Sequence, residues 1–319
     1  MLTLFSTPKP FRGHIDVIQR NALKSWKLLH PDAEVILFGD DEGAADVCRE
    51  LALRHEPQVL RSDRGTKRLD FIFARAQELA HYDLLCYVNC DIILTADFFL
   101  ALTRLLEWRP SFLMVGRRWD TDITQLLDFS RPSWQAEIIA RARAEGCQRF
   151  FHNIDYFAFP RGLYTEIPPL VIGRVGWDHW LVWKAGASGV AVVDVSEAVC
   201  AVHQNHDYAY HPEGIEGVWH DEEARRNNEL AGGSGRAQTI EDAAFRLTST
   251  SLRPNRFRRL APVKRRWRDL SRAVRGFVRT HVWHPVLDAT RPLRHAMGLN
   301  KDAVPTALRR TQRRHWMDQ

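Results

Sequence analysis

The sequence predicts an α/β protein, in which a Rossmann-like, mostly parallel central sheet is flanked by helices and followed by a basic, helical C-terminal tail. Short apolar runs alternate with segments of helical periodicity up to Gly116, which is typical of βαβ units. The run at 84–94 is apolar almost throughout, as expected of a strand buried on both faces. The tail is predicted from charge, because residues 253–319 hold 18 Lys and Arg against 4 Asp and Glu.

The first part of the chain supplies the βαβ alternation. Strands are expected where apolar, β-branched and aromatic residues cluster, at 2–6, 34–38, 58–60, 84–94 and 112–116. Helices are expected where apolar residues recur every three or four positions, at 15–29, 44–53, 65–80 and 97–107. Ligands of an open α/β sheet bind at the carboxyl ends of its strands, so the residues that follow each strand are the candidates for function.

After Gly116 the alternation is looser. Helices are expected at 135–145, from 176 onward and at 221–230, and strands at 156–162, 190–195 and 199–202. The Gly-rich segment 232–235 predicts a flexible break. We therefore expect an α/β domain over residues 1–247 and a basic, partly helical extension over residues 248–319.

The composition is that of a soluble globular protein, with 45% apolar and 26% charged residues. No apolar run approaches the roughly 20 residues of a transmembrane helix, and the N-terminus has no signal-peptide pattern. The five cysteines are scattered without C-x-x-C spacing, which favours a reducing compartment. We therefore expect a cytoplasmic protein.

The basic charge belongs to the tail. The first 252 residues hold 27 Lys and Arg against 35 Asp and Glu, so we expect no nucleic-acid binding by the domain. Residues 263–282 have the pattern of a basic amphipathic helix, and segment 253–282 could attach the chain to an anionic membrane surface, on its inner face. The alternative is a solvated helix that packs on its own domain.

Asp91 is the first candidate for a functional residue. It belongs to the short polar step Asn89-Cys90-Asp91 inside the apolar run 84–94. A carboxylate is costly inside a buried strand, so we expect Asp91 where the strand leaves the sheet. There it could hold a divalent cation against a substrate phosphate. The alternative is an Asp that caps the following turn.

Basic residues ahead of this strand could bind phosphate. Lys67 and Arg68, followed by Asp70, are expected at the start of a helix, where two cations and the helix dipole can hold a diphosphate. Asp40 or Asp41, after the second strand, could accept hydrogen bonds from a base or ribose. The alternatives are a solvated helix start and an ordinary turn.

Two groups further along the chain complete the set. Asp178, flanked by tryptophans at the start of a helix, could take a proton from a hydroxyl, and the alternative is an N-cap beside core aromatics. His203 and His206 follow the strand at 199–202 and could complete the metal site of Asp91 or neutralise a leaving diphosphate. A structural role for the histidines is the alternative.

The order of these groups resembles the nucleotide-sugar glycosyltransferases of the GT-A fold, in the broad family-2-like group of bacterial enzymes, over roughly residues 1–247. The resemblance implies that the donor nucleotide and its diphosphate contact Ser6, Thr7, Asp40 or Asp41, Lys67, Arg68, Asp70 and Asn89. The family's Asp-x-Asp metal motif aligns with Asn89-Cys90-Asp91, where Asn replaces the first acid. Asp91 would then hold Mn²⁺ or Mg²⁺ together with His203 or His206.

The same resemblance implies an activity. A sugar would pass from a nucleotide-diphosphate donor to a glycan or other hydroxyl acceptor with inversion, as in polysaccharide biosynthesis. Asp178 would be the base, without the Glu that often precedes it in the family.

Two other functions are compatible with these residues. A nucleotidyltransferase would share the sheet and the metal site, but it usually has a Gly-rich, Arg-containing loop after the first strand, where this chain has Ser6-Thr7-Pro8-Lys9-Pro10. A non-catalytic module that binds nucleotide sugars or a membrane is the other alternative, because Asn89 departs from the metal motif.

Overall fold

The computed structural model describes residues 1–207, 214–256, 258 and 263. Residues Met1–Asn255 form one compact unit, and every helix and strand named below belongs to it. The expected basic helix at 263–282 lies outside the described residues, apart from its first residue. The boundary between residues 247 and 248 and the membrane-binding role of 253–282 therefore stay predictions.

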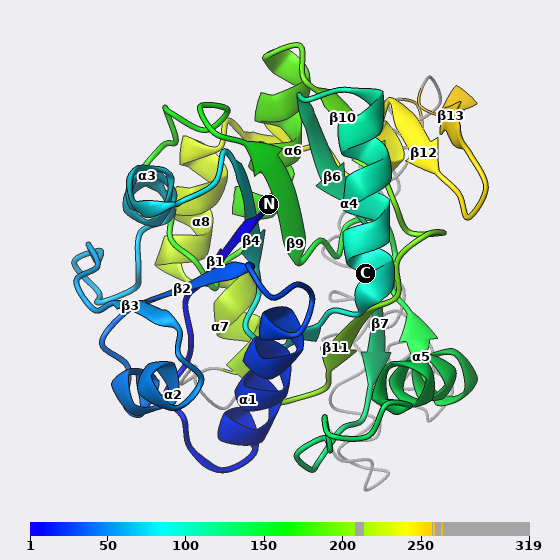
Figure 1. Cartoon of the computed structure of the whole chain (residues 1–319). Coiled ribbons are helices and arrows are strands. Elements are labelled where there is room, and N and C mark those ends of the chain that lie inside the picture. Colours follow the sequence, from blue (N-terminus) through cyan, green and yellow to red (C-terminus); the bar gives the residue numbers. More distant parts are fainter. Residues whose placement is uncertain (208–213, 257, 259–262, 264–319) are drawn as a thin grey trace, which may run out of the picture. The chain divides into compact units, whose positions relative to one another are not determined.

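In the described part of the chain, nine strands form a central sheet in the order β13-β12-β10-β6-β9-β4-β1-β2-β3 (Figure 1). Their bounds are β1 Thr3–Ser6, β2 Glu34–Phe38, β3 Arg54–Glu56, β4 Leu84–Val88, β6 Phe112–Val115, β9 Tyr156–Pro160, β10 Ala191–Asp194, β12 Phe245–Leu247 and β13 Leu252–Pro254. All run in one direction except β9 and β13. The predicted mostly parallel α/β sheet is confirmed.

Helices cover both faces of this sheet. Their bounds are α1 Gly13–Lys27, α2 Ala44–Glu50, α3 Leu69–Leu79, α4 Ala96–Trp108, α5 Trp134–Glu145, α6 Trp177–Ala187, α7 Gly214–His220 and α8 Glu222–Leu230. Trp26 of α1 and Phe98 of α4 belong to the core on one face, and Phe73 of α3 belongs to the core on the other. In β4, Cys86 packs into the first core and Tyr87 into the second, so this strand is buried on both faces as predicted.

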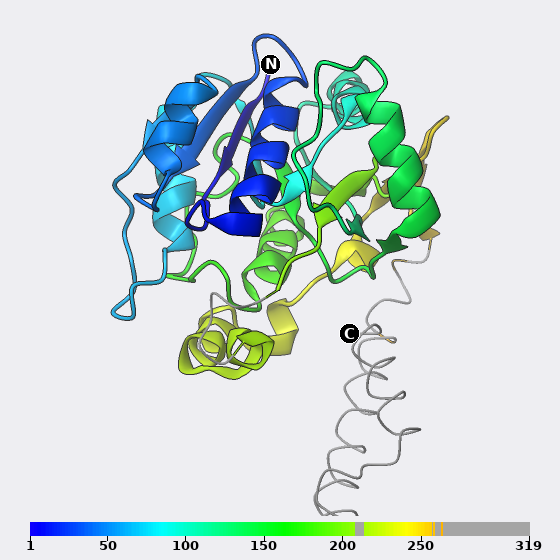
Figure 2. The ribbon, with the colours of Figure 1, turned by 90° about the horizontal axis from the view of Figure 1, so that it is seen from below.

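A second, four-stranded sheet packs against α5. Its strands, in spatial order, are β5 Ile92–Ile93, β11 Ala201–Gln204, β7 Arg118–Thr121 and β8 Cys147–Gln148. Figure 2 shows the unit from below, with α2 (blue) and α5 (green) on opposite flanks. The chain passes from the large sheet to the small one three times, from β4 to β5, from β6 to β7 and from β10 to β11. Because β4, β6 and β10 are parallel, all three crossings leave the large sheet at its carboxyl edge.

Several predicted elements are shifted in the structure. The strand expected at 58–60 is wrong, since β3 lies at Arg54–Glu56 and pairs with β2. The helix expected from 65 begins at Leu69, because backbone pairing of Arg61 with Lys67 and of Arg68 with Val171 keeps the preceding residues extended. The polar segment Arg118–Thr121, where no strand was predicted, is β7.

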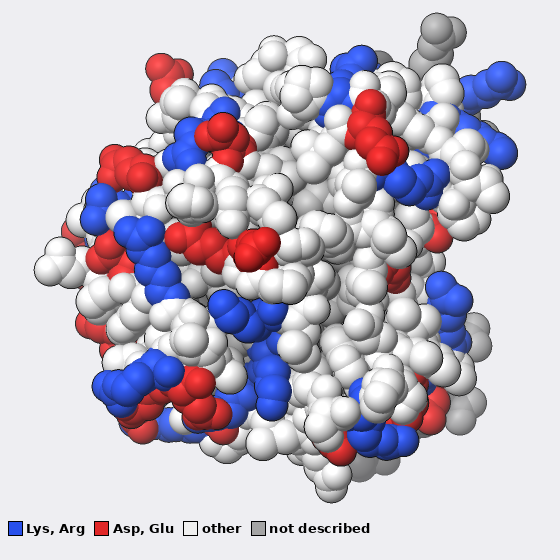
Figure 3. Space-filling model, viewed as in Figure 1, with Lys and Arg blue, Asp and Glu red and all other residues white. Residues whose placement is uncertain are grey.

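The described surface carries mixed charge. On the face shown in Figure 3, Lys and Arg side chains alternate with Asp and Glu. No helix within residues 1–207 and 214–256 combines the length and the hydropathy that a membrane span requires.

Candidate metal centre

Asp91 lies between β4 and β5, where the chain passes from the large sheet to the small one. Its backbone is held from both sides. The amide of Asn89 donates to the carbonyl of Asp155 (2.8 Å), and the backbone and side-chain amides of Gln204 donate to the carbonyl of Asp91 (3.1 and 3.2 Å). The predicted position of Asp91 at a strand end is confirmed, and two segments distant in sequence, around Asp155 and Gln204, fix it there.

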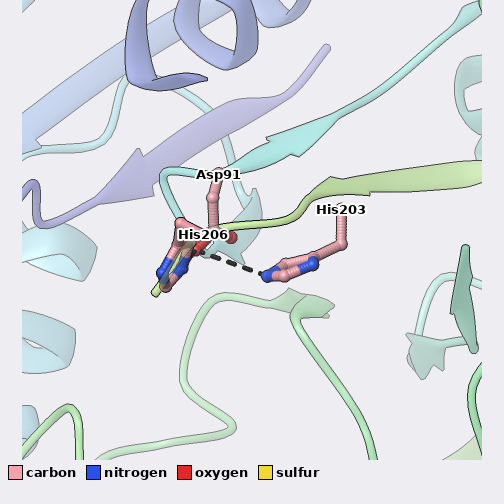
Figure 4. Close-up of side chains that lie close together, drawn as sticks. All are labelled: Asp91, His203 and His206. Atoms are coloured by element: carbon pink, nitrogen blue, oxygen red, sulfur yellow. Dashed lines mark hydrogen bonds and ion pairs between the residues drawn. The ribbon is translucent and has the colours of Figure 1, made fainter. Parts of the chain in front are cut away.

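His203, near the end of β11, and His206, just after it, turn toward the Asp91 carboxylate (Figure 4). The Nε2 atom of His206 lies 3.2 Å from Asp91 Oδ2, and that of His203 lies 3.8 Å from the same oxygen. The ligand atoms of the three residues all lie within 4.8 Å of one another. Backbone pairing of His203 with Ile92 brings β11 beside the strand that follows Asp91.

These side chains fit a divalent cation. Asp91 Oδ1 is buried and has no hydrogen-bond partner among the described residues, which leaves one carboxylate oxygen available as a ligand. One carboxylate and two imidazoles form a donor set that Mn²⁺ accepts more readily than Mg²⁺, which prefers oxygen ligands. The cluster could hold such an ion while leaving coordination positions for substrate oxygens.

The electrostatics keep Asp91 in its ligating form. Burial alone would raise the pKa of Asp91, but the nearby charges of His203, His206 and Lys9, together with the hydrogen bond from His206, hold that pKa well below its usual range. The carboxylate is therefore anionic at neutral pH and needs no deprotonation before it binds a cation.

Lys9 belongs to this site, although no function was predicted for it. Its Nζ atom lies 3.2 Å from His206 Nε2. Burial lowers the pKa of Lys9, and the charge of Asp91 opposes that shift. The one signal in the sequence was its place in the loop after β1, whose carboxyl end lies beside that of β4.

A network of paired charges surrounds His203. Its Nδ1 atom lies 3.2 Å from Asp120 Oδ1, on the ring side opposite to the nitrogen that faces Asp91. Asp120 also contacts Arg118 (2.8 Å) and Arg149 (3.2 Å). Although burial would raise the pKa of Asp120, His203 and the two arginines lower it. Asp120 can therefore fix the tautomer in which His203 Nε2 is free to bind a metal.

Asn89 belongs to the same network. Its side-chain amide donates to Asp155 Oδ1 (2.6 Å), and Arg118 donates to both oxygens of that carboxylate (2.9 Å each). Asp155 immediately precedes β9, and β9 lies next to β4 in the sheet. The amide of Asn89 thus ties the loop of Asp91 to Asp155, and its predicted contact with the donor stays a prediction.

Replacing Asp120 with asparagine is expected to weaken Mn²⁺ binding by about 10-fold to 100-fold. The amide keeps the size of the side chain but removes the charge that favours a proton on His203 Nδ1. Titration of the purified chain with Mn²⁺, followed by electron paramagnetic resonance, measures the affinity directly. Asp46→Asn, at an exposed site on α2, is the matched control. Equal affinity of Asp120→Asn and the wild type would contradict a positioning role.

Lys67 joins the loops that follow β1 and β2. Its ammonium donates to the carbonyl of Pro8 (2.7 Å) and forms an ion pair with Asp41. Burial lowers the pKa of Lys67, and the charge of Asp41 opposes that shift. Gly39 makes the arrangement possible, because a Cβ atom there would lie 2.7 Å from Asp41 Oδ2 and 3.0 Å from Lys67 Nζ. Lys67 also acts electrostatically on Cys90, beside Asp91.

The other residues expected at the donor site make contacts elsewhere and not with the pair of Lys67 and Asp41. Asp40 accepts a hydrogen bond from Arg61 (2.5 Å), whereas Arg68 and Asp70 pair with each other before and within the first turn of α3. Ser6 ends β1 and Thr7 follows it, and the buried hydroxyl of Thr7 has no hydrogen-bond partner among the described residues. The structure brings Asp41 and Lys67 together, and the roles of the rest stay predictions.

Asp178 is the second residue of α6, after Gly176, which has a φ of +97°. The alternative, in which Asp178 is the N-cap, is wrong, because Gly176 holds that position. Trp177 packs on Tyr87 of β4, with ring centroids 5.4 Å apart, and this contact places the start of α6 against the strand that leads to Asp91. The side chain of Asp178 is 21% exposed, so a substrate hydroxyl could reach it.

No protein-family model matches the sequence, and no curated protein matches it. Solved structures do match. The chain is similar to residues 1–349 of TarS from S. aureus, with 10% identity and a TM-score of 0.44 over 64% of this chain, and it spans only 60% of the length of that fragment.

The chain is also similar to glucosyl-3-phosphoglycerate synthase from Mycobacterium tuberculosis, in a complex with Mn²⁺, uridine diphosphate and glucosyl-3-phosphoglycerate. The identity is 13% and the TM-score 0.44, over 80% of this chain and 90% of the other. At this degree of likeness, the function of the chain has to be argued from its own residues.

Proposed function

We propose that the chain is a metal-dependent glycosyltransferase of the GT-A type, which moves a sugar from a nucleotide-diphosphate donor to an acceptor hydroxyl with inversion. The observation that supports this most is the cluster of Asp91, His203 and His206 at the carboxyl edge of a mostly parallel sheet. In such sheets this edge is where nucleotides bind. A cation site at that edge suits a substrate that carries a diphosphate.

The donor would lie between two groups of residues at this edge. Asp91, His203 and His206 would hold Mn²⁺, which when bound stabilises the negative charge that builds up on the leaving diphosphate. Lys67, beside the loops after β1 and β2, is placed to contact the same diphosphate, and Asp41 or Asp40 would accept hydrogen bonds from the nucleoside. Lys9, whose Nζ atom lies 3.2 Å from His206 Nε2, supplies a second cation.

The transfer needs a base on the acceptor side, and we assign that role to Asp178. The carboxylate takes the proton of the acceptor hydroxyl as its oxygen bonds to the anomeric carbon of the sugar. The bond between that carbon and the diphosphate oxygen breaks, and the nucleoside diphosphate leaves with the electron pair. Attack from the face opposite the leaving group inverts the anomeric configuration.

Calorimetry with a panel of nucleotide-diphosphate sugars, with and without Mn²⁺, tests this function. We expect at least one donor to bind with Mn²⁺ and to bind at least about tenfold more weakly without it. Product analysis then separates two reactions. A glycosyltransferase releases nucleoside diphosphate, whereas a nucleotidyltransferase moves the nucleoside monophosphate group by substitution at the α-phosphorus and releases sugar 1-phosphate from such a donor. Absence of metal-dependent donor binding would instead favour a non-catalytic module.

The acceptor and the place of the reaction are further parts of the proposal. A glycan acceptor and a role in polysaccharide biosynthesis suit a cytoplasmic enzyme that works at the inner face of a membrane. The basic segment 253–282 would hold it there through anionic lipids. This part of the proposal is supported by the charge pattern of the sequence.

A further inference from the structure

Two adjacent arginines at the crossing from β6 to β7 have different surroundings. Arg118 is paired with Asp120 and Asp155. The side chain of Arg117 makes no hydrogen bond or ion pair with any described residue, and its Nε atom is buried without a partner. Its guanidinium lies 4.7 Å from the centroid of the Phe151 ring. A partly buried cation without an anion is costly, so the surroundings of Arg117 suit a ligand that supplies negative charge.

The backbone of Arg117 is held in place. Its amide donates to the hydroxyl of Ser196 (2.8 Å), and that hydroxyl donates to the buried Asp194 (2.5 Å). Gly116, just before it, packs so closely on Tyr156 that a Cβ atom would lie 2.0 Å from the phenol oxygen. The guanidinium of Arg117 therefore projects from a rigid part of the fold.

A second arginine reaches the same aromatic ring. Arg246 of β12 lies 5.9 Å from the centroid of Phe151, and its Nε atom lies 3.5 Å from Asp194 Oδ2. Asp194 already accepts two hydrogen bonds from Ser196, from its amide and its hydroxyl. The charges of Asp194 and Glu197 act on Arg117, but neither carboxylate forms an ion pair with it. Arg246 neutralises the charge of Asp194, which accounts for its position. Arg117 has no carboxylate within ion-pair distance among the described residues.

These residues lie at the same edge of the sheet as the proposed site. Arg117 follows the carboxyl end of β6, and Phe151 precedes β9 at the same edge of the sheet. The carbonyl of His152 is 3.1 Å from Nε2 of His179, which follows Asp178 on α6. A short series of contacts thus connects the proposed base, through His179 and the 151–152 segment, to Arg117.

We propose that Arg117 and Arg246, packed on Phe151, bind an anionic group of the acceptor, a phosphate or a carboxylate close to the hydroxyl that receives the sugar. This inference rests on the proposed function and adds the chemical class of the acceptor. Two guanidiniums can hold one phosphate through charge-assisted hydrogen bonds. The anion could belong to a small soluble molecule or to a lipid headgroup.

Binding of inorganic phosphate and of glycerol 3-phosphate, with glycerol as the neutral counterpart, tests the site. The full chain is first saturated with the nucleotide found in the donor screen, without metal, so that the diphosphate site is filled. We expect both phosphates to bind the wild type and glycerol not to bind at the same concentrations. Arg117→Met and Arg246→Met should each weaken phosphate binding by at least about tenfold. Arg131→Met, at an exposed arginine on the surface, is the matched control and should leave it unchanged.

The outcomes separate this inference from the proposed function. Failure of phosphate to bind the wild type, or equal binding by Arg117→Met, overturns the anion site even when donor binding is metal-dependent. Loss of donor binding in Arg117→Met would show a general structural defect and also overturn it. Transfer to glycerol 3-phosphate, compared with phosphatidylglycerol vesicles, distinguishes a soluble acceptor from a lipid headgroup, and a preference for glycerol over both contradicts the proposal.

Discussion

Asp91→Asn is expected to weaken Mn²⁺ binding by more than about 100-fold and to abolish sugar transfer. Loss of a residue that only orients a ligand costs about 10-fold to 100-fold in metal affinity, and loss of the ligand itself should cost more. Asp91 is the only carboxylate in the cluster that the described residues form with His203 and His206. Electron paramagnetic resonance of Mn²⁺ gives the affinity, and release of nucleoside diphosphate in the presence of acceptor gives the activity.

Two further variants serve as controls for the loss of metal binding and of activity. Asp91→Glu keeps a carboxylate and should retain part of the affinity, whereas Asp46→Asn removes an exposed carboxylate of α2 and should change neither property. Removing the charge of Asp91 also leaves Lys9 and the histidines without their shared anion, so thermal unfolding without metal must accompany the assay. A folded Asp91→Asn chain that binds Mn²⁺ as tightly as the wild type would place the cation elsewhere.

The position of Asp91 could be predicted from sequence because it depends on local properties. The run before it alternates between two cores, with Leu84, Cys86 and Val88 on one face and Leu85 and Tyr87 on the other. A charged residue after such a run must lie at the end of the strand. The strand ends at Ser6 and Phe38 were located in the same way, so the edge of the sheet that carries the site was predictable.

The surroundings of the metal cluster were not predictable, because they depend on pairing between distant segments. His203 lies opposite Asp120 only because β11 pairs with β7 in that register. The sequence Arg-Trp-Asp-Thr of β7 is too short and too charged to predict a strand, and it forms one because it pairs with β11. Lys9 likewise approaches His206 through the packing of two loops.

The start of α3 shows the same limit. In sequence, Thr66 is a typical N-cap and Asp70 a typical first-turn residue, but tertiary contacts move the start of the helix. The hydroxyl of Thr66 donates to Glu223 of α8 (2.6 Å), and Arg68 pairs with Val171 through the backbone. These contacts hold the segment extended up to Arg68, and the helix begins one residue later. Lys67 therefore reaches Pro8 and Asp41 from an extended segment, and the prediction that it lies at the start of the helix is wrong.

Asp178→Asn is expected to lower the rate of transfer by about 10²-fold to 10⁴-fold, the usual contribution of a general base. Donor affinity in the presence of Mn²⁺ should stay as in the wild type, because Asp178 comes from α6 and Asp91 from the end of β4. Rate measurements at saturating donor, combined with calorimetry of donor binding, separate the two effects. Nuclear magnetic resonance of the product should show an anomeric configuration opposite to that of the donor.

The position of Asp178 in the first turn of a helix requires a matched control, since a negative charge there also stabilises the helix by roughly 0.3–1 kcal/mol. Asp16 occupies the first turn of α1, and Asp16→Asn removes the charge at that helix start together with its ion pair to Arg20, far along the chain from Trp177 and Tyr87. If both variants are equally folded and only Asp178→Asn loses transfer, the loss belongs to the proton and not to the helix. If Asp178→Asn transfers sugar at the wild-type rate, another group takes the proton. A wild-type product that keeps the anomeric configuration of the donor would exclude the inverting mechanism altogether.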